Sequence, residues 1–268
     1  MVDAKPIQIR QIRKAYNGVD VLQLDDLTIP AGQFICVVGP SGCGKTTLLN
    51  LVAGLASATH GEILVDEVSV TAPGPDRGIV FQQYALFPWL TVLDNVAFGL
   101  KMRGVEKTER YRQARHYLNL VGLDPYENYY PKHLSGGMMQ RAAIARAWIM
   151  HPTVLLMDEP FGALDAMTRR ELQAELLRWW IHEKQTIIFI THDMDEALFL
   201  GERVLIMGRH PGRVLKDVPI DFPYPRGPEI KVSSQFAEYE RTLWDCLHDQ
   251  GGIPTNNGNN EGRWMGVR

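Results

Sequence analysis

The pattern of apolar and polar residues divides the chain into strand-forming and helix-forming parts. Ile7 to Ile12 alternates apolar and polar side chains, which is typical of a strand with one exposed face. Val21 to Ile29, Gly61 to Asp66 and Val68 to Thr71 predict further strands, with glycine- and proline-containing turns in this part of the chain. We therefore expect an N-terminal antiparallel β region.

A second set of strands is apolar throughout. Strands of this kind are typical of parallel sheets whose two faces are both covered by helices. Helical patterns over Asp165 to Lys184 and Asp193 to Leu200 lie between the last members of the set. The sequence thus predicts an α/β fold with a mixed parallel core sheet, to which residues 214–219 add an edge strand. The apolar runs are Phe34–Val38, Gly78–Phe81, Val154–Met157, Ile187–Ile190 and Val204–Met207.

Residues 84–151 carry helical patterns and almost no strand pattern. Thr91, Thr108 and Ser135 have side chains that cap helix N-termini well, and a helical pattern follows each of them. We expect an α-helical subdomain inserted into one domain of residues 1–250. Its predicted parts are a core of residues 1–84 and 152–220, a helical insertion of about residues 85–151, and a C-terminal extension of residues 221–250 with a helix at 236–248. A flexible tail of residues 251–268 follows, rich in glycine and asparagine.

Composition and charge narrow the class of protein. With 45% hydrophobic and 22% charged residues, the 268-residue chain is an ordinary globular protein. Its net charge of -3 gives no basic surface for nucleic acid, so we expect no nucleic-acid partner. Cys36, Cys43 and Cys246 are odd in number and irregularly spaced, which fits a reducing cytosol. Because no apolar run suits a signal peptide or a membrane span, we expect any membrane role to be peripheral.

A glycine-rich loop stands between an apolar strand and the start of a helix. Glycines let the backbone curl so that successive N–H groups point at an anion, and the helix N-terminus adds partial positive charge. Lys45 would reach the β- and γ-phosphates of a nucleotide, and the Thr46 hydroxyl would bind Mg²⁺. The alternative is a glycine-rich turn with a surface lysine, but the strand–loop–helix context favours phosphate binding. The loop residues are Gly39, Pro40, Ser41, Gly42, Cys43, Gly44, Lys45, Thr46 and Thr47.

Two carboxylates follow a buried strand directly. Asp158 and Glu159 come after Val154–Met157, at the end of a strand where parallel sheets bind ligands. Asp158 would hold Mg²⁺ through its water shell, and Glu159 would act as the general base for the attacking water. A pair of solvated acids in a loop is the alternative, which their position after an apolar strand makes less favourable.

A second candidate anion site begins at Ser135. A capping serine followed by Gly136 and Gly137 gives a helix N-terminus with accessible N–H groups. An ordinary capped helix would have the same first residue. Two phosphate-binding helix starts cannot easily reach one γ-phosphate within a single subunit, whereas a two-fold dimer would let each subunit complete the other's site.

Together these residues resemble the motif set of ATP-binding cassette (ABC) ATPases. The motifs occur in the family's order and approximate spacing over about residues 7–215, and this order is more specific than any single motif. The resemblance implies an ABC-type P-loop NTPase fold, ATP hydrolysis and Mg²⁺ as cofactor. The residues that carry it are Lys45, Gln82, Ser135-Gly136-Gly137, Asp158-Glu159, Asp165 and His192.

The resemblance also implies roles for individual residues. Tyr16 would stack on adenine, Gln82 would sense Mg²⁺ and the attacking water, and His192 would contact the γ-phosphate. The Ser135–Gly137 segment would contact the γ-phosphate across the dimer interface, and Asp165 would link the two sites. Taken singly, Tyr16, Gln82 and His192 have ordinary alternatives as a turn tyrosine, a strand-end amide and a structural histidine.

One position departs from the commonest family signature. Met138 stands where the family usually has glutamine. This position lies one turn into the helix and contributes least to the phosphate contact, so the departure does not alter the expected activity. Methionine there is familiar in importers of nitrate, alkanesulfonates and taurine, which the chain also resembles at Asp76-Arg77-Gly78 and Phe161–Ala166. The resemblance implies an ATP-binding subunit that energises import of such a small anion. The choice of substrate would belong to other subunits.

Large apolar side chains follow Gln82, in the segment Tyr84–Leu90. They form either a hydrophobic corner of the core or an exposed patch that receives a short helix of another protein. In the family, two integral-membrane permease subunits dock on the ATPase subunits in this region. The resemblance therefore implies docking near Gln82–Leu90 and places the present chain peripherally on the cytoplasmic side of the cytoplasmic membrane. We expect a homodimer or pseudo-symmetric heterodimer of ATPase subunits, with a substrate-binding protein as an indirect partner.

Two other classes of protein share parts of this pattern. Soluble ABC proteins of DNA repair or translation have long coiled-coil insertions or two cassettes, and this chain shows neither. P-loop kinases and GTPases lack a Leu134–Met138 signature with a distant His192. The dependence of ATP hydrolysis on Ser135 would separate the kinases and GTPases from an ABC ATPase.

Overall fold

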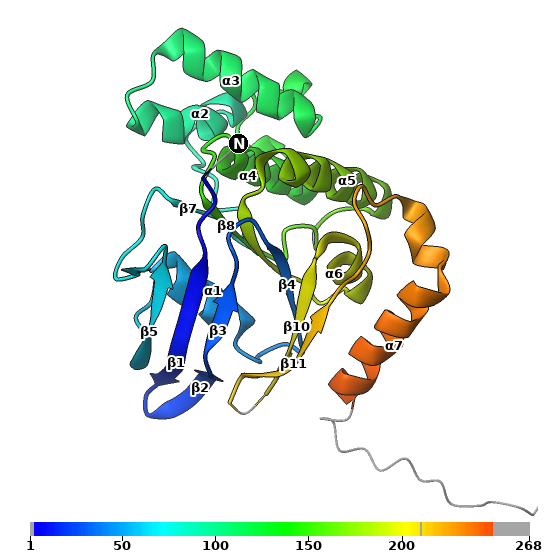
Figure 1. Cartoon of the computed structure of the whole chain (residues 1–268). Coiled ribbons are helices and arrows are strands. Elements are labelled where there is room, and N and C mark those ends of the chain that lie inside the picture. The colour runs from blue at the N-terminus through cyan, green and yellow to red at the C-terminus, as the bar shows by residue number, and fades with distance from the viewer. Residues whose placement is uncertain (1–2, 210, 249–268) are drawn as a thin grey trace, which may run out of the picture.

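The computed structural model describes residues 3–209 and 211–248 (Figure 1). Its N-terminal part is a five-stranded antiparallel sheet of order β2-β1-β5-β6, with β3 paired to β1. The strands are β1 (Ile7–Tyr16), β2 (Val19–Leu24), β3 (Leu27–Ile29), β5 (His60–Val65) and β6 (Val68–Ser69). The predicted antiparallel β region is therefore present.

The predicted strand over residues 21–29 is wrong in one respect, because it is divided into β2 and β3. β2 pairs with the second half of β1 and β3 with the first half. Between them, the Asp26 carboxylate accepts a hydrogen bond from the backbone N–H of Gln11 at 3.1 Å, where Gln11 has a φ of 45°. This contact at a bulge of β1 breaks the regular pairing.

The core sheet has six strands in the order β11-β10-β4-β9-β8-β7. Neighbours from β10 to β7 are parallel, and only the edge strand β11 is antiparallel. The mixed, mainly parallel sheet predicted from the apolar runs is thus confirmed. The strands are β4 (Phe34–Val38), β7 (Arg77–Val80), β8 (Val154–Asp158), β9 (Thr186–Ile190), β10 (Arg203–Gly208) and β11 (Arg213–Pro219).

Both faces of the core sheet are buried, which explains why its strands are apolar throughout. In β4, Phe34, Cys36 and Val38 point into one hydrophobic cluster, and Ile35 and Val37 point into another. The second cluster lies between the two sheets and contains the buried face of α1 (Lys45–Ala53). The first is covered by the remaining helices. A strand with two apolar faces is the pattern expected of a central parallel strand.

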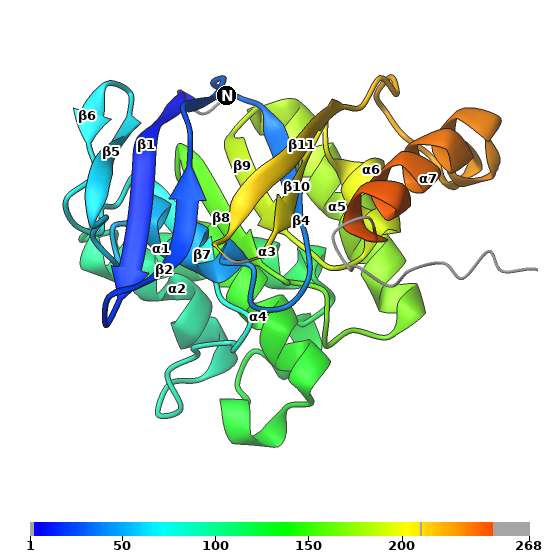
Figure 2. The same ribbon diagram turned by 90° about the horizontal axis from the view of Figure 1, so that it is seen from below.

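Three helices form a group at one end of the molecule, above the sheets in Figure 1 and below them in Figure 2. They are α2 (Val92–Met102), α3 (Lys107–Leu120) and α4 (Gly136–Trp148), with the short 3₁₀ helices η1 (Asp124–Tyr126) and η2 (Pro131–His133). Thr91 and Ser135 cap α2 and α4 as predicted. The predicted cap of α3 is wrong: the Glu106 carboxylate, not the Thr108 hydroxyl, accepts from the free N–H groups of Thr108 and Glu109. A carboxylate is also favoured there by the helix dipole.

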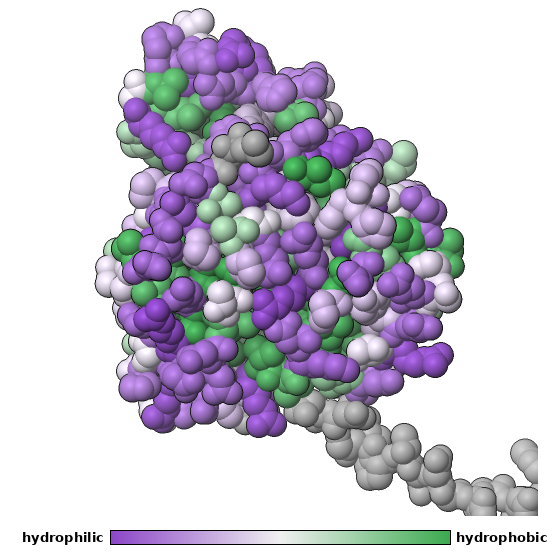
Figure 3. All heavy atoms as spheres, in the orientation of Figure 1, coloured by the Kyte–Doolittle hydropathy of each residue, from purple (hydrophilic) through white to green (hydrophobic). Residues whose placement is uncertain are grey.

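The C-terminal half adds α5 (Ala166–Glu183), α6 (Met194–Leu200), η3 (Pro228–Val232) and α7 (Ser234–His248). α7 packs on the core through Phe236 and Leu243. The predicted tail of residues 251–268 lies outside the described residues. On the face seen in Figure 3, hydrophilic residues predominate and apolar ones are scattered between them. Within residues 3–209 and 211–248, no helix is both long and apolar enough to span a bilayer.

Candidate functional site

The glycine-rich loop connects β4 to α1 at the carboxyl edge of the core sheet (Figure 1). Gly42 and Gly44 have φ values of 79° and 91°, which side-chain-bearing residues rarely adopt. A Cβ on Gly39 would lie 2.6 Å from the carbonyl oxygen of Met207 on β10. The glycines therefore serve both a tight turn and a close approach to the neighbouring strand.

Lys45 and Thr46 begin α1 at the base of this loop. Lys45 is 7% exposed, and its Nζ donates to the carbonyl oxygens of Gly39 at 2.7 Å and Pro40 at 3.2 Å. The ammonium is thus fixed within the loop, beside the N-terminus of α1. The loop lines a cavity of about 300 Å³ together with Val21, Gln82 and Glu159.

Thr46, which lines this cavity, is hydrogen-bonded to Asp158. The Thr46 hydroxyl donates to Asp158 Oδ2 at 2.9 Å, and Asp158 is buried. Burial raises the pKa of Asp158, the Glu159 carboxylate raises it further, and Thr46 and Lys45 act in the opposite direction. Hydroxyl and carboxylate oxygens are the ligands that Mg²⁺ prefers, so the residues present suit that ion. In the described part of the chain no three histidine, cysteine or acidic residues cluster as a metal site. Mg²⁺ is usually bound by a few protein oxygens, and substrate phosphates and water complete its coordination.

Three polar side chains meet where β7, β8 and β9 end. Glu159 Oε2 accepts from Gln82 Nε2 at 3.2 Å and lies 3.2 Å from His192 Nδ1. Because these strands are neighbours and parallel, the residues that follow them reach the same edge of the sheet. Glu159 has a φ of 44°, a conformation that non-glycine residues adopt at a cost and often at functional sites. The three predicted catalytic residues therefore lie together.

Three other predicted site residues do not join this group. The Ser135 hydroxyl accepts from Met138 N–H at 3.3 Å as the cap of α4. Asp165 caps α5 and accepts from Met167 and Thr168 N–H groups, and its hydrogen bonds with Thr168 lower the pKa of its carboxylate. Tyr16 is exposed at the end of β1, with Lys14 Nζ 4.6 Å from its ring centroid.

Gly136 and Gly137 lie in the first turn of α4, beside the segment that follows Gln82. A Cβ on Gly136 would lie 2.7 Å from the Tyr84 hydroxyl. Within residues 3–209 and 211–248, no hydrogen bond or ion pair joins Ser135 to the phosphate loop. Ser135 is exposed at the start of α4, and one chain alone does not join it to Lys45.

The segment after Gln82 is anchored from beneath by Asn95. The buried Asn95 side chain accepts from Phe87 N–H at 2.8 Å and donates to the carbonyl oxygens of Phe87, Leu90 and Thr91. Trp89 is 70% exposed, next to a cavity of about 170 Å³ that Phe98 also lines. The apolar residues of this segment therefore include both core and surface positions.

The sequence did not point to several residues that shape the site. Val21 lines the loop cavity, and a Cβ on Gly212 would lie 2.1 Å from the carbonyl oxygen of Cys43. Asn95 and Glu196 are buried polar residues, and they contact the segment after Gln82 and the residue before His192, respectively. Only Glu196 had a visible signal, because Asp193 and Glu196 have the spacing of a capping box.

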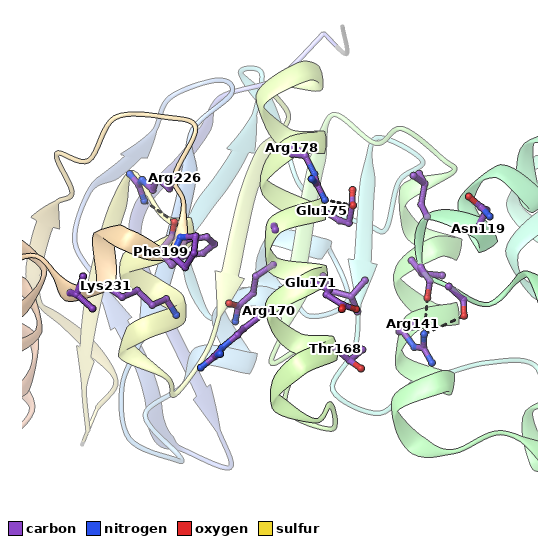
Figure 4. Close-up of a pocket in the computed structure, with 18 residues that line it drawn as sticks. Asn119, Arg141, Thr168, Arg170, Glu171, Glu175, Arg178, Phe199, Arg226 and Lys231 are labelled. Atoms are coloured by element: carbon purple, nitrogen blue, oxygen red, sulfur yellow. Dashed lines mark hydrogen bonds and ion pairs between the residues drawn. The ribbon is translucent and has the colours of Figure 1, made fainter.

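A larger cavity, of about 870 Å³, lies elsewhere, between α5, the end of α3 and η3 (Figure 4). Arg226 lines it but donates to backbone carbonyl groups, among them that of Phe199, and Arg178 is paired with Glu175. None of the predicted site residues lines this cavity. Although this cavity is larger, we assign the functional site to the smaller one, because the phosphate loop, the carboxylates and the histidine lie there.

Comparison with known proteins identifies the family of the chain. A protein-family model described as ABC transporter matches residues 22–162, more than half of the chain. The chain belongs to the ABC transporter family. This membership confirms the predicted family and the predicted class of enzyme, an ABC-type ATPase that binds ATP.

Individual relatives cover most of the chain. It is 50% identical over 244 residues to an ATP-binding protein of Brucella abortus, covering 91% of this chain and 94% of the relative. It is 47% identical over 251 residues to the nitrate import ATP-binding protein of a Synechocystis species (90% and 94%). With the aliphatic sulfonates import ATP-binding protein of Bacillus cereus, identity is 44% over 242 residues (90% and 94%).

A solved structure supports the fold. A dimeric ATP-binding cassette in a post-hydrolysis state, bound to ADP and Pi, is similar to this ABC ATPase with a TM-score of 0.74 and 30% identity. The similarity covers 81% of this chain and 100% of that one. The predicted ABC-type P-loop NTPase fold is thereby confirmed.

Proposed function

We propose that this chain is the ATP-hydrolysing subunit of an importer for small anions, and that it works as a dimer on the cytoplasmic face of the membrane. The observation that carries the proposal is the meeting of Gln82, Glu159 and His192 beside the loop that holds Lys45. A phosphate-binding loop next to a base, an amide and an imidazole suits hydrolysis of a nucleotide.

In this proposal the loop residues 39–47 bind the triphosphate through backbone N–H groups and the N-terminus of α1. Lys45 exchanges its loop carbonyl partners for the β- and γ-phosphates. Glu159 accepts the proton of the attacking water, while the Gln82 amide and the His192 imidazole orient the water and the γ-phosphate. Tyr16, on the exposed end of β1, provides an aromatic face for adenine.

Mg²⁺ would be held by Thr46, by Asp158 through water, and by Gln82. When bound there, the ion would neutralise charge on the β- and γ-phosphate oxygens. The hydrogen bond between Thr46 and Asp158 already holds these two oxygens 2.9 Å apart.

The dimer is proposed because one chain leaves its second anion site unused. Ser135, Gly136 and Gly137 present the open N-terminus of α4, and Asp165 lies at the start of α5. A two-fold axis would place Ser135–Gly137 of one subunit over the phosphate loop of the other. A homodimer or a pseudo-symmetric heterodimer satisfies this geometry equally.

The membrane partners and the substrate class rest on separate observations. The segment anchored by Asn95 carries the exposed Trp89 with a cavity beside it, which suits docking of a short helix. In the dimer, the two copies of this segment would receive two integral-membrane permease subunits, one helix each. The relatives named for import of nitrate and aliphatic sulfonates favour a small anion, delivered to the permease by a substrate-binding protein.

Replacing the proposed base tests the function. In Glu159→Gln we expect ATP to bind and to hold two chains together, because the amide cannot accept the proton, while turnover falls by about a factor of a hundred or more. Light scattering with MgATP measures the dimer, and phosphate release measures turnover. Glu171→Gln, an exposed acid of α5, is the control and should behave as the unchanged protein. Rapid turnover in Glu159→Gln would contradict the assignment.

A further inference from the structure

A buried carboxylate lies behind the candidate active site, and no step of the proposed reaction uses it. Glu196, in the first turn of α6, is 5% exposed. Glu196 Oε2 accepts from the Thr191 hydroxyl at 2.6 Å, and Oε1 accepts from Gln173 Nε2 at 3.0 Å. Arg169 Nε lies 3.8 Å from Oε1. Burial raises the pKa of Glu196, whereas these partners favour its ionised form.

The partners of Glu196 flank His192 on the chain. Thr191 precedes His192, and its hydroxyl also accepts from Asp193 N–H at 3.0 Å. The Asp193 carboxylate in turn accepts from Glu196 N–H at 3.2 Å. The residues on both sides of His192 are therefore tied to Glu196, Thr191 through the carboxylate and Asp193 through the backbone N–H, while the imidazole itself is exposed and contacts Glu159.

The other partners lead to the start of α5. Gln173 and Arg169 both belong to α5. Arg169 Nη2 donates to the carbonyl oxygen of Leu164 at 3.1 Å, directly before Asp165, and Arg169 Nη1 lies 3.7 Å from Asp193. A continuous polar path thus runs from the Leu164–Asp165 turn through Arg169 and Glu196 to the loop of His192.

We infer that Glu196 is the positioning residue that sets the orientation of His192 and couples it to the turn before α5. The inference deepens the proposed function and rests on it for the role of His192. The two oxygens of the carboxylate accept from donors of two elements at once, Gln173 on α5 and Thr191 before His192, whereas an amide of similar size has only one accepting oxygen. If Asp165 contacts a second subunit, docking of that subunit would reach His192 through this path.

Glu196→Gln separates positioning from binding. The amide oxygen can accept from Thr191 or from Gln173, but not in the same way from both, and its NH₂ group would face a donor. We expect kcat for ATP hydrolysis to fall about tenfold with KM for ATP nearly unchanged, since the phosphate loop is untouched. Glu175→Gln on the outer side of α5 is the matched control, because it makes the same chemical change at the pair with Arg178.

A double variant restores the order of donors and acceptors. In Glu196→Gln with Gln173→Glu, the amide donates to the new carboxylate and still accepts from Thr191, so kcat should recover in part. If Glu196→Gln does not fold, Gln173→Leu, which removes one donor and keeps the carboxylate, should lower kcat in the same direction.

A spectroscopic readout tests the inference without hydrolysis. The imidazole ¹⁵N–¹H signals of His192, identified by their loss in His192→Gln, should shift in Glu196→Gln, remain in place in Glu175→Gln and return in the double variant. Unchanged His192 signals in folded Glu196→Gln would overturn the inference, whatever happens to kcat. An absence of ATP hydrolysis by the unchanged protein would instead overturn the proposed function.

Discussion

Gly212 packs its backbone against the phosphate loop. Its N–H donates to the carbonyl oxygen of Val21 at 2.9 Å, and a Cβ would lie 2.1 Å from the carbonyl oxygen of Cys43. In Gly212→Ala either the loop or β2 has to move, at a cost of about 1–3 kcal/mol. We expect the affinity for ATP to fall about tenfold, as measured by titration with a fluorescent ATP analogue.

Gly104→Ala serves as the control for Gly212→Ala. Gly104 has a φ of 76° and open space around its Cβ position, so the substitution adds backbone strain far from the loop without a collision. ATP affinity should be unchanged in this variant. Equal affinities of Gly212→Ala and the unchanged protein would show that the loop tolerates the displacement.

Tyr117 connects α3 to His151, which lies between α4 and β8. Its hydroxyl is 2.8 Å from His151 Nε2, and burial raises the pKa of Tyr117 to about 12. At pH 8 we expect Tyr117→Phe to lower the free energy of unfolding by about 1 kcal/mol, because the hydrogen bond is lost. Above pH 10 the unfolded chain ionises this tyrosine more readily than the folded chain does, so its stabilising contribution is lost as the pH rises toward 12.

The stability difference between Tyr117→Phe and the unchanged protein should therefore shrink between pH 8 and pH 11. Urea unfolding at both pH values, in the same buffer series, measures it. A difference that stays constant would mean that Tyr117 titrates equally in the folded and unfolded chains.

At the level of elements, the sequence predicted which segments form strands and helices, because burial on one or both faces leaves a local pattern. It did not predict the break between β2 and β3, which depends on the contact of Asp26 with Gln11. It also missed Glu106 as the cap of α3, since Thr108 is the more favoured capping residue by local rules. Contacts between distant residues decide these details.

The candidate site, too, was predictable only in part. The phosphate loop and the pair Asp158-Glu159 were predictable, because each is a motif contiguous in sequence. That Gln82, Glu159 and His192 meet follows only from the order of β7, β8 and β9 in the sheet. The capping-box spacing of Asp193 and Glu196 did not link Glu196 to the site, because its partners on α5 are more than twenty residues away along the chain.

At the scale of the whole molecule, no hydrogen bond or ion pair within residues 3–209 and 211–248 joins Lys45 to Ser135 of the same chain. If the proposed dimer forms, every site combines Lys45 of one subunit with Ser135 of the other. A chain with Lys45→Ala and a chain with Ser135→Arg should then each be inactive alone, because both lose one half of every site.

Mixing the two variants gives the decisive outcome for this arrangement. In a mixed dimer, the intact loop of the Ser135→Arg chain meets the intact Ser135 of the Lys45→Ala chain, so one of the two sites is whole. With random pairing, about one quarter of all sites are restored, and ATP hydrolysis by the mixture should exceed that of either variant. A mixture of Lys45→Ala with a Glu159→Gln chain restores no site, because in each of its sites either the loop or the base is altered. If both mixtures stay equally inactive while dimers are present, Lys45 of one subunit and Ser135 of the other do not form a site together.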